Sequence, residues 1–322
     1  MLGIEPYMIQ QDYASKDSFF DKLNNYLLAA RREKWLDEKT IVVFPEYTGT
    51  WLVLAGESEE TFRAASLNWA ERGMVFRHPL KFLSYFLKAK EKGKAEAAFF
   101  RMKASQMADI YQDVFSQLAR DHKVTIVAGS IVLPAPHIAS GRLTLTSGSL
   151  QNVSVVFGPD GALHPHVIAK AFPTARELPF TVPARAENIR SFETPAGRLG
   201  VLICADSWYP QAYLPLKQQQ IDLLAVPSYD VFGMEQWNRP WAGYSGWPAP
   251  EDVDLNDVAS LTEGQAWKKY ALAGRIRSIG VTKGLNVFLR GKIWDQDLGG
   301  WPATVVRDDE VFIEEQTQRP PC

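Results

Sequence analysis

The 322-residue chain has only two cysteines. So few cysteines exclude a disulfide framework and a cysteine-rich zinc site. Cys322 is the last residue, in a position where chains usually fray. Cys204 comes at the end of the apolar run 199–203. A buried core thiol is the simplest interpretation there, and a reactive thiol is the alternative.

The sequence also lacks a long hydrophobic run and an excess of charge. No apolar stretch approaches the about 20 residues that a membrane-spanning helix needs. The N-terminus has no basic segment followed by an apolar one, so we expect no signal peptide. The 35 Lys and Arg residues against 37 Asp and Glu leave no surplus to neutralise a phosphate backbone. We therefore expect a soluble, cytoplasmic protein with no nucleic-acid partner and no membrane partner.

Short apolar runs bounded by Gly, Pro or Asp recur along the chain. Their β-branched composition predicts strands, and continuous apolar runs suit strands covered on both faces. The runs are 41–44, 124–127, 153–157, 199–203, 223–226 and 286–289.

Helical patterns lie between these runs, with apolar residues spaced to share one helix face. The three faces are Phe19, Leu23, Leu27 and Ala30; Met107, Ile110, Val114, Phe115 and Leu118; and Trp267, Tyr270, Ala271 and Ile276. Strands and helices that alternate in this way predict a layered α/β fold.

Two long segments fit this alternation less well. Within 52–106, the part 80–88 has the pattern of an amphipathic helix. Packing on the core is favoured for it over contact with a membrane surface or a partner. The segment 229–262 is rich in Trp, Tyr, Pro and Gly, which is typical of a functional or interfacial loop.

Three chemically capable side chains stand at the ends of predicted strands. They are Glu46, Lys170 and Cys204, and sites in open α/β sheets lie at the carboxyl ends of strands. A helix that begins soon after Cys204 would lower the pKa of its thiol. A solvated glutamate and a surface lysine are the alternatives for the other two residues. The succession of all three at strand ends favours a site.

Histidine does not complete this set. None of the five histidines stands at a comparable strand end. His164 and His166 flank a proline with no Cys or carboxylate nearby to complete a metal site, which favours a surface turn. If Cys204 is a nucleophile, we expect its base to be a residue other than histidine.

Several segments resemble the motifs of the nitrilase, or carbon–nitrogen hydrolase, superfamily. They are 44–46 (Phe-Pro-Glu), 128–130 (Ala-Gly-Ser), 152–161, 170–177, 200–210 and 284–288. The 34 positions from Lys170 to Cys204 also suit this family.

The resemblance implies a four-layer α-β-β-α sandwich, assembled as a homodimer or a larger homo-oligomer. It implies that Glu46 is a general base, Lys170 an oxyanion stabiliser and Cys204 the nucleophile. Glu177 would be a carboxylate that orients the site, and the backbone N–H of Ala205 would face the oxyanion. Lys170 is expected to lower the pKa of the Cys204 thiol. The resemblance implies no metal and no organic cofactor.

The motifs extend from Glu46 to Asn286, so we predict a single domain over residues 1–322. The extra length falls in insertions at about 52–106 and 229–262, with a frayed tail at about 315–322. The family's late Gly-Gly-x-Ser motif lacks its serine, because the chain has Gly-Gly-Trp-Pro at 299–302. The insertions bear on the substrate and the assembly rather than on the chemistry.

The residues around the cysteine bear on the substrate. Cys204-Ala205-Asp206 is closer to the amidase and carbamoylase branches than to the Cys-Trp-Glu of nitrile-cleaving members. Ser207 and Trp208 stand where carbamoyl-amino-acid hydrolases tend to have arginines, which predicts a neutral or aromatic-walled pocket. Candidate walls, each of which core packing would explain equally well, are Tyr47, Trp51, Trp208 and Tyr209.

Arg176 is expected to pair with a neighbouring carboxylate rather than to bind an anion. The sequence as a whole predicts a Cys-dependent hydrolase of a small amide or carbamoyl compound, acting through a thioester-type acyl-enzyme. A nitrilase is the alternative within the same fold. A non-catalytic or N-acyltransferase-like member is the alternative of another class.

Overall fold

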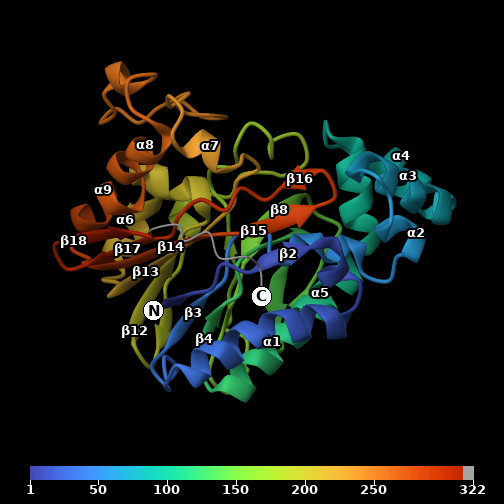
Figure 1. Ribbon diagram of the computed structural model, residues 1–322, viewed down its shortest axis with the longest axis horizontal. Helices are drawn as coiled ribbons and strands as arrows, with labels where there is room; N and C mark the ends of the chain where they lie inside the picture. The colour runs from blue at the N-terminus through green and yellow to red at the C-terminus, as the bar shows by residue number, and fades with distance from the viewer. Residues whose placement is uncertain (315–322) are drawn as a thin grey trace.

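The computed structural model describes residues 1–314 and contains two main β-sheets with helices on their outer sides (Figure 1). The first sheet, in spatial order, consists of β1 (Leu2–Gly3), β3 (Ile41–Val43), β4 (Thr125–Val127) and β9 (Val156–Phe157). The second consists of β11 (Phe192–Thr194), β12 (Gly197–Val201), β13 (Leu223–Ser228), β14 (Lys283–Phe288), β17 (Thr304–Arg307) and β18 (Glu310–Ile313). The predicted α/β class is confirmed.

The layers follow from the alternation of side chains along β3. Val42 is buried in one core cluster together with Phe19 of α1 (Lys16–Arg32) and Phe115 of α5 (Lys94–His122). Val43 points the other way, into the cluster that contains Val201 of the second sheet. Successive side chains of a strand face opposite sides, so this sheet lies between two helices and the second sheet. Helix α6 (Pro210–Gln218) shares that second cluster, which completes the order helix, sheet, sheet, helix.

Parallel pairing brings the ends of several strands to one edge of each sheet. β1, β3 and β4 are parallel to one another, and so are β12, β13 and β14. Glu46 follows β3, Cys204 follows β12 and Tyr229 follows β13. The smaller sheets are β10 (Ile168–Ala169), β8 (Leu150–Ser154) and β5 (Ile131–Pro134); β16 (Gln296–Asp297), β15 (Arg290–Ile293) and β2 (Tyr7–Ile9); and β6 (His137–Ala139) with β7 (Arg142–Thr144).

All six predicted strands are present, but one of them is divided. The run 153–157 contains the end of β8 and all of β9, which belong to different sheets. Val155, between them, is fully buried. Apolar composition alone does not reveal such a change of sheet, because both halves are buried.

The predicted helix faces at 19–30 and 107–118 lie in α1 and α5, and all their residues are buried except Ile110, which is half-buried. The third predicted face is broken into α8 (Glu263–Tyr270), α9 (Leu272–Arg275) and a 3-10 turn, η6 (Ile276–Ile279). The break lies at Ala271, whose backbone is not helical (φ −101, ψ −148). The direction of the chain therefore changes within a pattern that predicted one continuous helix.

The first insertion forms helices at one end of the molecule (Figure 1). They are η2 (Thr50–Leu54), α2 (Glu59–Phe62), α3 (Leu67–Arg77), α4 (Pro79–Lys88) and the start of α5. The amphipathic helix predicted at 80–88 is present as α4, and it packs on the core as favoured, but only along one side. No residue of α4 is buried. Only one side of it, which includes Phe82 and Tyr85, is half-buried against the core.

The second insertion is irregular and packs closely on the protein. It contains two short helices, α7 (Met234–Trp237) and η5 (Leu255–Asp257). Its Trp241 is only 2% exposed and stacks on Trp208 at 5.7 Å between ring centroids. No helix within residues 1–314 has the length and apolar content to cross a bilayer. Cys322 and the predicted frayed tail lie outside the described residues.

Candidate active site

Three strand ends bring the predicted residues together in the interior. Glu46 follows β3, Lys170 follows β10 and Cys204 follows β12. Their exposed fractions are 2%, 2% and 5%. The backbone N–H of Lys170 donates to the carbonyl of Asn152 on the neighbouring strand β8, 2.9 Å away, which fixes where its side chain begins. Side chains of these types are rarely so deeply buried without partners.

The ammonium of Lys170 lies between two carboxylates. Its Nζ donates to Glu46 Oε1 and to Glu177 Oε2, each at 2.7 Å. Asn152 Nδ2 donates to Glu46 Oε1 at 2.7 Å and to Glu177 Oε1 at 3.1 Å. We call these four residues the charged floor. The double link through lysine and asparagine fixes the position of both carboxylates.

Glu177 has further donors outside the charged floor. The Tyr47 hydroxyl donates to its Oε1 at 2.9 Å. The Thr174 backbone N–H and hydroxyl donate to its Oε2 at 2.8 and 3.0 Å. Glu177 therefore accepts hydrogen bonds at both oxygens, which suits a permanent anion.

The two carboxyl groups of the charged floor differ in pKa. Burial raises the pKa of Glu46 to about 7, with Lys170 opposing the rise and Glu177 adding to it. Burial also disfavours the charge of Glu177, but Lys170 and the other donors outweigh it and hold its pKa below the usual value. Burial works against the charge of Lys170 too, yet the two carboxylates raise its pKa well above the usual value. At neutral pH, Glu46 is the group of the three that can exchange a proton.

The sequence predicted a helix that begins soon after Cys204, whereas the structure has a short turn there and the helix α6 begins only at Pro210. Cys204 begins a five-residue 3-10 turn, η4 (Cys204–Trp208), and has a left-handed backbone with φ 49. Its Sγ lies 3.7 Å from the carbonyl oxygen of Tyr229. Non-glycine residues are strained in this region, and such strain is concentrated at functional sites.

The expected net lowering of the thiol pKa was wrong, although Lys170 acts on the thiol in the expected direction. Burial raises the pKa of Cys204 well above the usual value, Glu46 adds to the rise, and Lys170 opposes it only in part. Burial of the thiol is the main cause, and the carboxylates of Glu46 and Glu177 add to it against the single ammonium of Lys170. The resting cysteine is a neutral thiol beside a carboxylate that can accept its proton.

Asp206 is a buried residue of the site that the sequence analysis did not single out. Its Oδ1 accepts from the backbone N–H groups of Ala171 and Phe172, at 2.9 and 2.8 Å. Its Oδ2 accepts from Ile203 N at 3.3 Å. Burial raises its pKa to about 7. Asp206 therefore joins the turn at the cysteine to the segment that follows Lys170.

Two backbone features shape the site, one next to Cys204 and one next to the loop of Glu46. Within residues 1–314, the N–H of Ala205 donates to no protein group, and Ala205 lines the cavity described next. Gly129 supports the loop of Glu46, because its backbone is left-handed (φ 69) and a Cβ there would lie 2.1 Å from Pro45 O. Only glycine fits this close contact.

A cavity of about 660 Å³ opens above the charged floor and Cys204. Each insertion contributes to its walls. The first insertion provides Leu67, Ala70 and Met74 of α3, and the second provides Trp241 and Tyr244. All four predicted wall residues line this cavity: Tyr47, Trp51, Trp208 and Tyr209.

The walls also contain charged groups. Four carboxyl groups line the cavity beyond the charged floor, and within residues 1–314 none has a basic side chain at ion-pair distance: Glu71, Glu96, Asp230 and Glu263. Burial raises the pKa of Asp230 and of Glu263 to about 7 in each case. Arg176 also lines the cavity, where it lies over the Phe232 ring at 4.4 Å instead of pairing with a carboxylate as expected.

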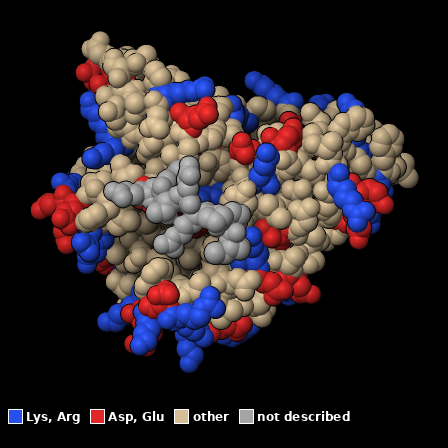
Figure 2. All heavy atoms as spheres, in the orientation of Figure 1, with Lys and Arg blue, Asp and Glu red and all other residues tan. Residues whose placement is uncertain are grey.

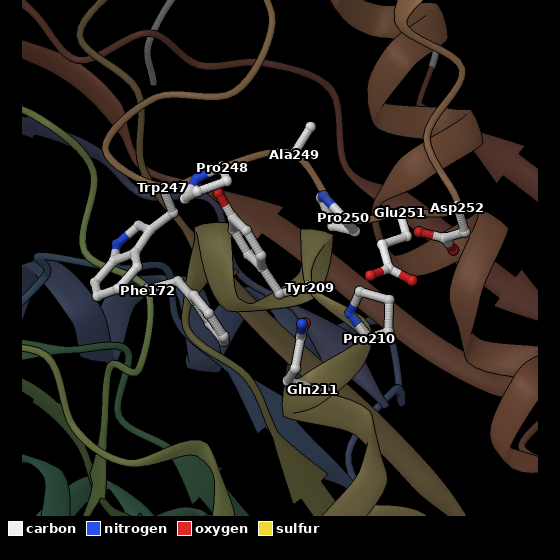
Figure 3. A pocket seen from close by; sticks show the side chains of 10 residues that line it. All are labelled: Phe172, Tyr209, Pro210, Gln211, Trp247, Pro248, Ala249, Pro250, Glu251 and Asp252. Carbon is white, nitrogen blue, oxygen red and sulfur yellow. The ribbon is translucent and has the colours of Figure 1, made fainter.

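A second cavity, of about 680 Å³, lies beside the first and contains none of the charged-floor residues. Figure 3 shows Phe172, Tyr209 and Trp247 toward one end of it and Glu251 and Asp252 toward the other. Tyr209 lines both cavities and stacks on Phe172 at 4.1 Å. The second insertion therefore covers the segment that follows Lys170 as well as the walls of the first cavity.

The comparison with known protein families agrees with this geometry. The family model described as carbon–nitrogen hydrolase matches residues 7–249, which include every residue of the charged floor and Cys204. The chain belongs to the carbon–nitrogen hydrolase family. It is a hydrolase that acts on carbon–nitrogen bonds other than peptide bonds. No curated protein sequence matches it.

Solved structures of similar fold include other members of the superfamily. A carbon–nitrogen hydrolase from Helicobacter pylori G27 has a TM-score of 0.55 and 18% identity, over 93% of this chain and 83% of that one. The NitN amidase from Nesterenkonia sp. AN1 has a TM-score of 0.52 and 11% identity, over 95% and 89%. Saccharomyces cerevisiae Nit3, of the nitrilase superfamily, has a TM-score of 0.52 and 15% identity, over 96% and 81%. At these identities the likeness shows the fold.

Proposed function

We propose that this carbon–nitrogen hydrolase is a cysteine amidase that acts on small amides, with Cys204 as nucleophile and Glu46 as general base. The observation that carries the proposal is a buried lysine held at 2.7 Å from each of two carboxylates, beside a thiol at the base of a cavity. In a mutant of the similar Nesterenkonia amidase, the acetamide moiety of fluoroacetamide is attached covalently to the active-site cysteine. That precedent supports a nucleophilic cysteine at the base of the cavity.

In the proposed first half-reaction, Glu46 takes the proton of the Cys204 thiol as sulfur attacks the amide carbonyl carbon. A carbon–sulfur bond forms, and the carbonyl oxygen becomes an oxyanion. The ammonium of Lys170 and the free N–H of Ala205 stabilise this charge. The carbon–nitrogen bond then breaks as Glu46 returns the proton to the leaving nitrogen, so that ammonia or an amine departs and a thioester remains.

In the second half-reaction, a water molecule attacks the thioester carbon while Glu46 accepts its proton. The carbon–sulfur bond breaks, the carboxylic acid leaves, and the thiol regains a proton from Glu46. Glu177 stays ionised throughout and holds Lys170 in place, together with Tyr47 and Thr174. A thiol with a raised pKa suits this scheme because Glu46 accepts its proton during attack.

The cavity supports a preference among amides. Four carboxyl groups without basic partners, against a single Arg176, disfavour a substrate with a negative charge. The apolar and aromatic walls favour a neutral acyl group. We propose neutral amides as the substrates. The single domain and the homo-oligomer expected from the sequence remain predictions.

Ammonia release from a panel of neutral amides and their matching nitriles, with Cys204→Ala as the control, tests the proposal. We expect release from amides by the wild-type protein only, and a mass increase on Cys204 equal to the acyl group when turnover is stopped in acid. Turnover of the nitriles alone would identify a nitrilase instead. Turnover of amides that persists in Cys204→Ala would overturn the assignment of the nucleophile.

A further inference from the structure

The helices α3 and α4 present large apolar side chains to solvent. The exposed fractions are 84% for Phe76, 83% for Leu80, 50% for Leu83 and 70% for Leu87. Trp69, near the start of α3, is 60% exposed. Single exposed apolar residues are common, but a group on two adjoining helices marks an interaction surface. We call these five side chains the apolar face.

The spacing of these residues explains why the core does not cover them. Leu80, Leu83 and Leu87 lie three and four residues apart, which places them on one side of α4. Phe82 and Tyr85 lie on another side and pack against the core. The helix therefore has two apolar sides, of which one has no partner within residues 1–314. Figure 1 shows α3 and α4 at the far end of the molecule from α6 and α9.

Basic residues surround the apolar face. Between positions 72 and 94 the chain has seven lysines and arginines and one acid, a formal net charge of +6 in a chain whose total is −2. All seven are exposed, and none forms an ion pair with a described residue: Arg72, Arg77, Lys81, Lys88, Lys90, Lys92 and Lys94. The one acid, Glu91, pairs with Arg101. Figure 2 shows largely uncharged atoms at this end, with Lys and Arg along its upper edge and a mixed group of basic and acidic residues on its lower side.

We propose that the apolar face docks on an anionic lipid surface. An amphipathic helix with basic residues beside its apolar side lies in the plane of a membrane, with the apolar side chains among the lipid headgroups and the cations near lipid phosphates. Tryptophan, here Trp69, is enriched at such interfaces. No membrane partner was expected from the sequence, because it has no spanning segment and no surplus of positive charge in total. The local positive charge of α3 and α4 is a separate property.

The charge argues against a second copy of this chain as the occupant. A symmetric dimer through the apolar face would bring two segments of charge +6 together. Like charges at an interface disfavour association. An anionic lipid surface matches both the charge and the apolar side chains. The opposite side of α3 lines the cavity through Ala70 and Met74, so a docked molecule would hold its cavity close to the lipid.

Co-sedimentation of the full chain with vesicles tests the proposal. We expect the protein to pellet with vesicles of phosphatidylserine and phosphatidylcholine in equal amounts, and to stay in solution with pure phosphatidylcholine. Salt at high concentration should weaken the binding, because it screens the attraction to the lipid. Failure to pellet with the phosphatidylserine vesicles would overturn the proposal.

Variants separate the two contributions. Leu80→Ser with Leu87→Ser should reduce vesicle binding by about tenfold or more, through loss of apolar burial. Lys81→Glu with Lys88→Glu should reduce it by a similar factor. The matched control is Leu214→Ser with Leu255→Ser, since these leucines are 57% and 66% exposed elsewhere on the molecule. The control should bind as the wild type does.

Two further measurements keep the outcome clear. All variants should retain the wild-type rate on a water-soluble amide, because none of the changed residues lines the cavity. If the leucine variant instead abolishes a concentration-dependent dimer and leaves vesicle binding unchanged, a second copy covers the apolar face and the lipid proposal is wrong.

Discussion

The charged floor contains four hydrogen bonds of 2.7–3.1 Å among Glu46, Lys170, Glu177 and Asn152. The walls from the two insertions instead present mostly apolar and aromatic side chains to the same cavity. A charged group in the floor has no substitute, because its partners are buried and would lose their compensation. A wall residue can be exchanged for another apolar one with a moderate effect. In the proposed mechanism, the charged floor therefore determines the reaction, and the walls select the substrate.

The largest effect is expected at the nucleophile. Cys204→Ala should lower kcat by at least about a thousandfold, since no other group can form the covalent intermediate. Thermal unfolding should change little, because the substitution removes one sulfur atom. Cys322→Ala is the matched control and should keep full activity. Turnover by Cys204→Ala near the wild-type rate would show that the reaction does not need the Cys204 thiol.

Lys170→Met tests whether the floor is more than a buried ion pair. Glu46 and Glu177 would lose the one cation that lies within ion-pair distance of them among residues 1–314, at a cost of about 3–5 kcal/mol in stability. Lys103→Met is the matched control, since Lys103 is also buried and pairs with Glu57 at 2.8 Å. We expect a similar fall in the free energy of unfolding for both, measured in denaturant, but loss of activity only for Lys170→Met. Equal loss of activity would trace the effect to general destabilisation.

The pH dependence identifies the proton acceptor. Glu46 must be ionised to accept a proton, so kcat/KM should rise with pH through about 7 and then level off. Glu46→Gln should lower kcat by about a hundredfold or more and remove this rise. Glu5→Gln is the control, because burial raises the pKa of Glu5 to about 8 outside the cavity. If Glu5→Gln alters the profile instead, the titrating group is misassigned.

A wall substitution should act on binding. Trp51→Phe keeps an aromatic ring in the cavity but changes its size, so KM should change several-fold while kcat stays within about twofold. Trp35→Phe, at an exposed position remote from the cavity, should leave both constants unchanged. A change in kcat alone would show that Trp51 acts on the reaction step, as the charged floor does, rather than on substrate binding.

The smallest effect concerns the carboxyl groups of the walls. Asp230→Asn with Glu263→Gln should improve kcat/KM for an amide with a negative charge, relative to a neutral one, by about twofold to fivefold. The effect is small because both groups have pKa values of about 7 and are only partly charged near neutral pH. Glu235→Gln, on the exposed helix α7, is the control. An unchanged ratio would separate substrate choice from cavity charge.

The sequence predicted more of the floor than of the walls, for a physical reason. Glu46 and Cys204 follow parallel strands of the two main sheets, and the carboxyl ends of such strands are where sites form in open α/β sheets. Lys170 follows β10, which is antiparallel to β8, and a lysine directly after a short apolar run was the signal for it. Asn152 lies inside β8, where sequence does not specify what a side chain faces. The pKa of Cys204 depends first on the burial of the thiol and then on three nearby charges, at distances that only the fold determines. Contact of the 80–88 helix with a membrane surface or a partner was only the less favoured alternative, because helical periodicity does not show which apolar side meets the core.

The charged floor has a consequence for how the protein becomes active. Its four members come from positions 46, 152, 170 and 177, and the thiol beside them from 204. Contacts between such distant positions close long loops, and they form slowly because that closure costs chain entropy. A chain that has folded only its first sheet holds Glu46 but not the turn of Cys204. During refolding, hydrolytic activity should therefore return only when the whole fold is complete, whereas helix content can return earlier.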